Sequence, residues 1–213
     1  MRPEYIFMNV VAPSFILVPL ITALIRYQYL SAAGRVLFVY LVVDAVVSIL
    51  SSTLAYHHVP NMPLYHFATI VDTVLLLYFF LMVFAEKRWA RYLIVCMFVF
   101  PLLAVLNLLF LQPLFSFNSY MLSLKSMLLI GLCFLYWWYY EPVAGKAWKT
   151  IPLHWIISGL LLYFSSVFIL FTFSDLIISI SSRSISIVLW NIHAGLSVIM
   201  YLLLAIGLSK YKS

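Results

Sequence analysis

Seven long runs of apolar residues dominate the sequence and restrict the folds available to it. Each run is about 20 residues long, the length that an α-helix needs to cross the hydrocarbon core of a bilayer. The runs do not alternate in polarity, so they indicate helices and not the strands of a membrane barrel. We predict an all-α, seven-transmembrane helix bundle that occupies 1–213 as a single transmembrane domain. The predicted spans are about 5–25, 36–57, 63–85, 92–111, 119–140, 154–174 and 186–208.

The composition supports a polytopic membrane protein. Hydrophobic residues make up 66% of the chain and charged residues 8%, whereas a soluble domain carries roughly 25% charged residues. The net charge of +6 does not indicate nucleic-acid binding, because the basic residues are scattered among short loops and not gathered on one soluble face.

The distribution of basic residues between alternate loops predicts the orientation. One side holds only Arg2 and Arg183, and this asymmetry places the N-terminus outside and the C-terminus in the cytoplasm. It is typical of a bacterial inner membrane. The first span is expected to be a retained helix with kinks at Pro13 and Pro19. The basic residues of the predicted cytoplasmic side are Arg26, Arg35, Lys87, Arg88, Arg91, Lys146, Lys149, Lys210 and Lys212.

Several ionisable residues fall within the spans or at their outer ends, where a charge is costly and indicates a site. Four of the five histidines, all but His154, lie on the predicted outer side, and Asp72 lies near mid-membrane. We therefore predict an outward-facing polar pocket, with Asp44 at its floor. Its predicted residues are His57, His66, Asp72, Lys125, Asn191, His193 and Asp44.

The two aspartates have different expected environments. Lys125 lies in the outer half of its span and is a plausible partner for Asp72, as either a structural salt bridge or a functional pair. Asp44 has no basic residue at a similar depth in an adjacent span. We expect it to be protonated, hydrogen-bonded to serines or exposed to a water-filled cavity.

The outer histidines allow three interpretations. His57 and His58 can be interfacial residues that close a short turn, or they can titrate as a proton sensor. Alternatively, His57, His66 and His193 supply three ligands to a zinc ion, with one coordination position left open.

The region around Thr53-x-x-x-His57, Asp72 and His193 resembles the seven-transmembrane hydrolase superfamily of alkaline ceramidases and adiponectin receptors. That resemblance implies a zinc site, with Thr53 where the family has serine. The position four residues before His193 is Leu189, where the family has a further histidine ligand, and the spacing from His57 to Asp72 is longer than in the family.

Three functions follow from these features. The first is a small-molecule or proton sensor, or a small transporter, that binds its ligand in the outer pocket. The second is a zinc-dependent intramembrane hydrolase of a lipid amide or ester, with Asp72 as general base or as a residue that orients a zinc ligand. The third is a structural helper subunit of a membrane complex, in which the polar residues only hold helices together.

Overall fold

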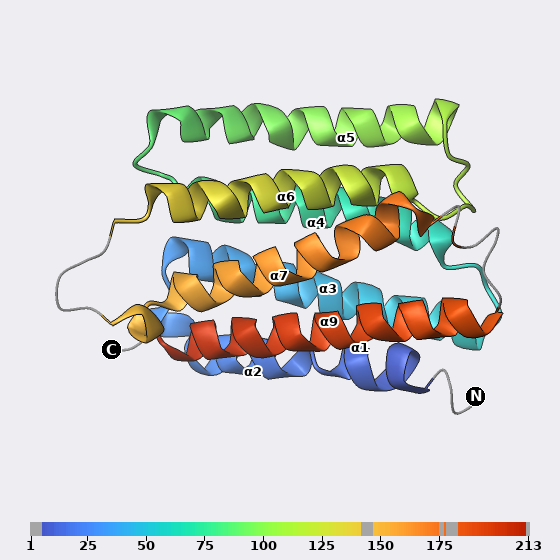
Figure 1. Ribbon diagram of the computed structural model, residues 1–213, viewed down its shortest axis with the longest axis horizontal. Coiled ribbons are helices and arrows are strands. Elements are labelled where there is room, and N and C mark those ends of the chain that lie inside the picture. Colours follow the sequence, from blue (N-terminus) through green and yellow to red (C-terminus); the bar gives the residue numbers. More distant parts are fainter. Residues whose placement is uncertain (1–5, 142–146, 175–176, 178–182, 212–213) are drawn as a thin grey trace. The chain divides into compact units, whose positions relative to one another are not determined.

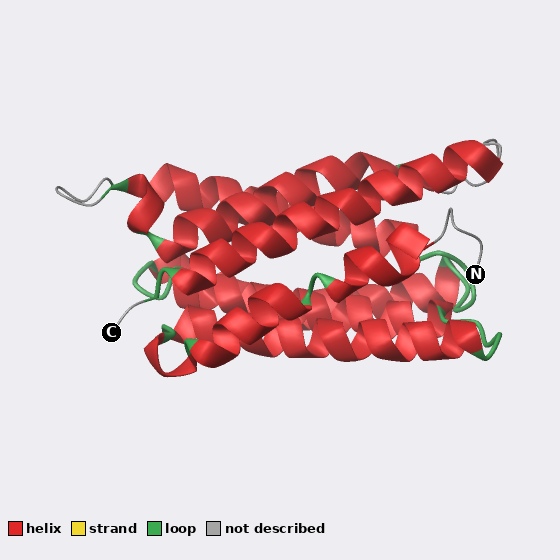
Figure 2. Cartoon of the chain, turned by 90° about the horizontal axis from the view of Figure 1, so that it is seen from below, coloured by secondary structure: helices red, strands yellow, loops and turns green. Residues whose placement is uncertain are grey.

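The structure is a computed structural model, and it describes 6–141, 147–174, 177 and 183–211. In this part of the chain all regular structure is helical (Figure 2). Within the described ranges, seven helices are long and apolar enough to cross a membrane, with mean hydropathies of 1.5 to 2.7. Their bounds confirm the predicted spans to within a few residues: Phe7–Ile25, Ala32–Tyr56, Met62–Val83, Arg88–Phe110, Ser119–Tyr139, Pro152–Thr172 and Ile185–Ser209.

The first span is not one regular α-helix, and its break at Phe15 and Ile16 lies about one turn before Pro19. It consists of a π-helical turn η2 (Phe7–Val11), the short α1 (Ala12–Ser14) and α2 (Leu17–Ile25). Proline removes a backbone donor and clashes with the preceding turn, so interruptions near Pro13 and Pro19 are expected.

The remaining elements follow the predicted order. The other spans are α3 (Ala32–Tyr56), α4 (Met62–Val83), α5 (Tyr92–Phe110), α6 (Ser119–Tyr139), α7 (Pro152–Thr172) and α9 (Arg183–Ser209). The 3₁₀ turns η3 (Tyr27–Tyr29), η4 (Arg88–Arg91) and η5 (Trp148–Thr150) precede α3, α5 and α7.

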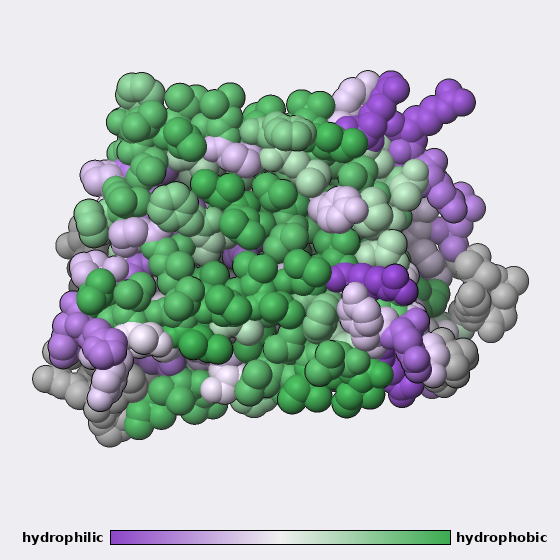
Figure 3. All heavy atoms as spheres, turned by 180° about the vertical axis from the view of Figure 1, so that it is seen from behind, coloured by the Kyte–Doolittle hydropathy of each residue, from purple (hydrophilic) through white to green (hydrophobic). Residues whose placement is uncertain are grey.

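Large apolar side chains cover the outer surfaces of these helices. Phe98 is 75% exposed, Phe110 is 76% exposed and Trp138 is 82% exposed. On the face drawn in Figure 3, apolar residues cover the middle of the helices and hydrophilic residues gather at their ends. Such an apolar surface is solvated by lipid and not by water, so the chain is suited to a bilayer as a multi-pass membrane protein.

The chain divides into two compact units, which we describe one at a time. The first contains Met1–Leu30 and Ser126–Ser213, and the second contains Ser31–Lys125. In the first unit α9 packs along α7 and against α2 (Figure 1). Gly159 and Gly207 lie at the α7–α9 contact, and a Cβ atom at either position would come within 3.0 Å of the facing helix. Small residues at helix interfaces allow this close packing in membranes.

The second unit is built on α4, which packs against both α3 and α5. Ser31 caps the start of α3 by accepting a hydrogen bond from the Gly34 amide at 3.2 Å. The turn between α3 and α4 contains His58 with a positive φ of 58°. A side-chain bond from Asn61 Nδ2 to Ser51 Oγ, at 2.8 Å, joins this turn to α3.

Candidate functional site

The second unit contains an ion pair within two membrane-spanning helices. Lys125 Nζ on α6 lies 3.4 Å from Asp72 Oδ2 on α4, and the two side chains are 8% and 15% exposed. This contact confirms the predicted pairing. The Nζ–Oδ2 distance is longer than the 2.7–2.9 Å typical of charge-assisted hydrogen bonds, so the hydrogen bond within this ion pair is weak.

The second carboxylate oxygen of Asp72 is buried without a partner. Oδ1 has no hydrogen-bond donor, although Oδ2 faces the lysine. A buried ion pair compensates for its desolvation only when its remaining lone pairs are also satisfied. Asp72 therefore presents an unused acceptor within the membrane-spanning part of the second unit.

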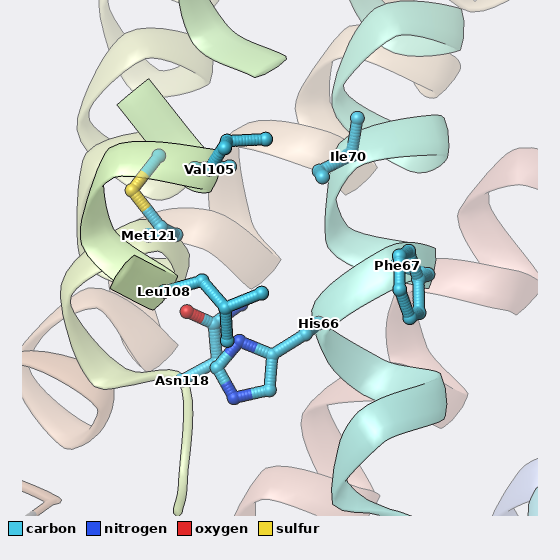
Figure 4. A pocket seen from close by; sticks show the side chains of 8 residues that line it. His66, Phe67, Ile70, Val105, Leu108, Asn118 and Met121 are labelled. Carbon is cyan, nitrogen blue, oxygen red and sulfur yellow. The ribbon is translucent and has the colours of Figure 1, made fainter. Parts of the chain in front are cut away.

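His66 lies closer to the start of α4 and is held by the connection that precedes α6. It is 6% exposed, and its Nε2 lies 3.1 Å from the Ser116 carbonyl oxygen. A carbonyl only accepts hydrogen bonds, so Nε2 carries the proton. Beside it is a small cavity of about 40 Å³ between α4, α5 and the start of α6 (Figure 4).

A network of amide side chains organises the connection between α5 and α6. Gln112 accepts a bond from the Tyr120 amide at 3.2 Å and donates one to Ser119 Oγ at 2.6 Å. Asn107 Nδ2 donates to Gln112 Oε1 at 3.3 Å. Sequence reasoning missed this network, because uncharged amides near a loop give no distinctive signal.

This network predicts the effect of replacing Gln112, which is 6% exposed. Gln112→Leu should lower the free energy of unfolding by about 1–3 kcal/mol, because buried partners lose their hydrogen bonds. Chemical unfolding in detergent micelles measures this change. Gln28→Leu replaces an exposed glutamine in η3 and should leave stability within about 0.5 kcal/mol of the wild type. Equal stability of the two variants would contradict the role of Gln112.

The two histidines at the end of α3 are exposed. His57 follows the last residue of the helix and contacts the Tyr56 ring edge-on, with ring centroids 5.3 Å apart. Thr53, the hydroxyl residue of the family-like motif, donates to the Ile49 carbonyl at 2.8 Å within its own helix. Asp44, on the same helix, is half-buried and has an interaction partner.

His193 belongs to the first unit and lies among aromatic rings. The ring centroids of Tyr163, Phe171 and Trp190 are 5.5 to 5.8 Å from that of His193. Its Nδ1 is buried without a hydrogen-bond partner. Asn191, two residues earlier, is half-buried and has an interaction partner of its own. The predicted common pocket combines residues of both units, and it stays a prediction.

His154 has the most aromatic surroundings of the described histidines. It is fully buried, and its Nδ1 donates to the Trp148 carbonyl at 3.1 Å. The rings of Tyr136, Trp137, Tyr140 and Trp148 have centroids 4.4 to 6.0 Å from its own. These contacts join η5 to α7 and to the end of α6 within the first unit. In the sequence, the only sign of these aromatic surroundings was the dense aromatic run 136–140.

Comparisons with protein-family models, curated proteins and solved structures found no match. The described residues contain no group of three His, Cys, Asp or Glu side chains that could hold a metal ion. Zinc and the hydrolase resemblance therefore remain predictions without support from another observation. Arg2, Lys146 and Lys212, which contribute to the predicted orientation, lie outside the described residues.

Proposed function

We propose that this multi-pass membrane protein binds a proton or a small polar ligand at Asp72, as a sensor or small transporter does. The observation that carries the proposal is the incomplete Asp72–Lys125 pair, with Oδ1 buried and without a donor. An ionisable group inside a membrane span is costly to keep, and such groups mark ligand and proton pathways.

The pair can act as a switch because the two carboxylate oxygens of Asp72 have different surroundings: Oδ2 faces Lys125, and Oδ1 has no donor. A proton or a ligand N–H or O–H on Oδ1 would reduce the charge that holds Lys125 to Oδ2. Since Asp72 lies on α4 and Lys125 lies near the start of α6, weakening the pair changes the free energy of the contact between α4 and this first part of α6. A transporter would couple that change to release of the ligand, and a sensor would couple it to a partner.

Proton binding is tested with purified protein in lipid vesicles that contain a pH-sensitive dye. After an acid pulse, the wild type should carry protons faster than protein-free vesicles, and Asp72→Asn should lose this activity. Glu86→Gln is the matched control, because Glu86 is exposed in a turn outside the spans. Its rate should equal that of the wild type.

Infrared difference spectra of the same proteins test the sensor. Acidification should produce a carboxylic-acid band that is present in the wild type and in Glu86→Gln but absent in Asp72→Asn. The proposal is wrong for protons if Asp72→Asn matches the wild type in both the flux and the infrared band.

A further inference from the structure

A second polar site lies beside His66, at the cavity of about 40 Å³. A cavity needs roughly 10–15 Å³ of volume open to the centre of a water molecule for each water that it holds, so there is room for about three. Most of the lining is apolar, including Ile70 on α4, Ala104 on α5 and Met121 on α6. The polar side chains of the lining are those of His66 and Asn118 (Figure 4).

Asn118 supplies the first acceptor. It is 3% exposed and its Oδ1 is buried without a hydrogen-bond partner. Its backbone carbonyl accepts a bond from the Leu122 amide, so it stands at the N-cap position of α6. An asparagine there ordinarily bonds a free amide of the first turn. Here Gln112 bonds the Tyr120 amide instead, and the Asn118 side chain faces the cavity.

His66 supplies the second acceptor. Because Nε2–H donates to the Ser116 carbonyl, the lone pair of this imidazole tautomer lies on Nδ1. In Figure 4 one ring nitrogen of His66 faces toward Leu108 and Asn118, and the other faces away from them. Asn118 Oδ1, which is buried without a donor, and the His66 ring thus border one small space.

We propose that this cavity is a binding site for a small hydrogen-bond donor, with water as its occupant. A water molecule would donate one hydrogen to Asn118 Oδ1 and the other to His66 Nδ1. An anion without an N–H or O–H group, such as chloride, has no hydrogen to donate and does not match two acceptors. The ammonium ion has the same donor chemistry, and the experiment distinguishes it from water. This site is separate from the Asp72–Lys125 pair, so either proposal can fail alone.

Water-edited solid-state NMR of protein labelled with nitrogen-15 histidine tests the site in bilayers. The wild type should show magnetisation transfer from water protons to the His66 ring, with the signal assigned by its loss in His66→Gln. Ala104→Val adds two methyl groups to the cavity wall and should abolish the transfer. Asn118→Leu removes an acceptor and should also abolish it. Leu102→Val, at an exposed position on the same helix as Ala104, should retain it.

The other histidines provide internal references. His57 and His58 are exposed and should show transfer in every variant, whereas the fully buried His154 should show none. Absence of transfer to His66 in the wild type, both without and with added ammonium chloride, overturns the proposal, as does unchanged transfer in both Ala104→Val and Asn118→Leu. If transfer to His66 appears only after ammonium chloride is added, the cavity does bind a hydrogen-bond donor. The occupant is then the ammonium ion and not water.

Discussion

Lys125→Met should destabilise the protein by about 3–5 kcal/mol, the cost of breaking a buried ion pair from one side. Lys125 Nζ is the donor that the structure places at Asp72, whose Oδ1 already has no partner. The substitution leaves the carboxylate largely buried and uncompensated. Chemical unfolding in detergent micelles measures the loss.

The double variant Lys125→Met/Asp72→Leu separates the pair from other effects of the lysine. Replacing both members of a buried pair by apolar residues is often neutral or stabilising, so the double variant should recover most of the loss. Lys149→Met changes an exposed lysine in η5 and should leave the free energy of unfolding within about 0.5 kcal/mol of the wild type. A double variant less stable than Lys125→Met would refute this assignment.

Gly207→Ala should lower the free energy of unfolding by about 1–3 kcal/mol through overpacking of α9 against α7. A Cβ atom at Gly207 would lie 2.6 Å from Ile156 Cγ1 and 2.9 Å from the Pro152 carbonyl oxygen. The backbone oxygen cannot move aside without shifting the start of α7. Thermal unfolding of the purified protein measures the change.

Gly195→Ala is the matched control in the same helix. Apart from its chain neighbours and the backbone of its own helix turn, no described atom lies within 4 Å of a Cβ added at Gly195, so an alanine side chain would have space there. The variant should be as stable as the wild type or more stable by about 0.5–1 kcal/mol, because alanine favours a helix over glycine. Equal effects at Gly195 and Gly207 would show that close packing does not decide the outcome.

The spans and the Asp72–Lys125 pair could be predicted because both depend on features that are visible along the sequence. Span length depends on the number of consecutive apolar residues, which is visible in one dimension. The pair could be predicted because few charges enter the membrane and these two lie at compatible depths. Its incomplete geometry could not be predicted, since the distance between two helices depends on all the side chains between them.

The surroundings of the histidines depended on tertiary structure. His66 bonds a backbone carbonyl at Ser116, 50 residues away, and a carbonyl carries no sequence signature. At the cavity beside it, Gln112 and not Asn118 accepts the Tyr120 amide, and the sequence does not show this exchange of capping partner. Similarly, η5 places Trp148 beside His154.

The sequence by itself determined that this chain is an all-α membrane protein with seven spans, because hydrophobic length and scarcity of charge are properties of the chain alone. The tertiary structure decided which buried polar atoms are left without partners. Among the described residues these atoms include Asp72 Oδ1, beside the lysine, Asn118 Oδ1, at the cavity, and His193 Nδ1, among aromatic rings. A hydrogen bond requires atoms within about 3 Å, and only the packing of helices from distant parts of the chain sets such distances.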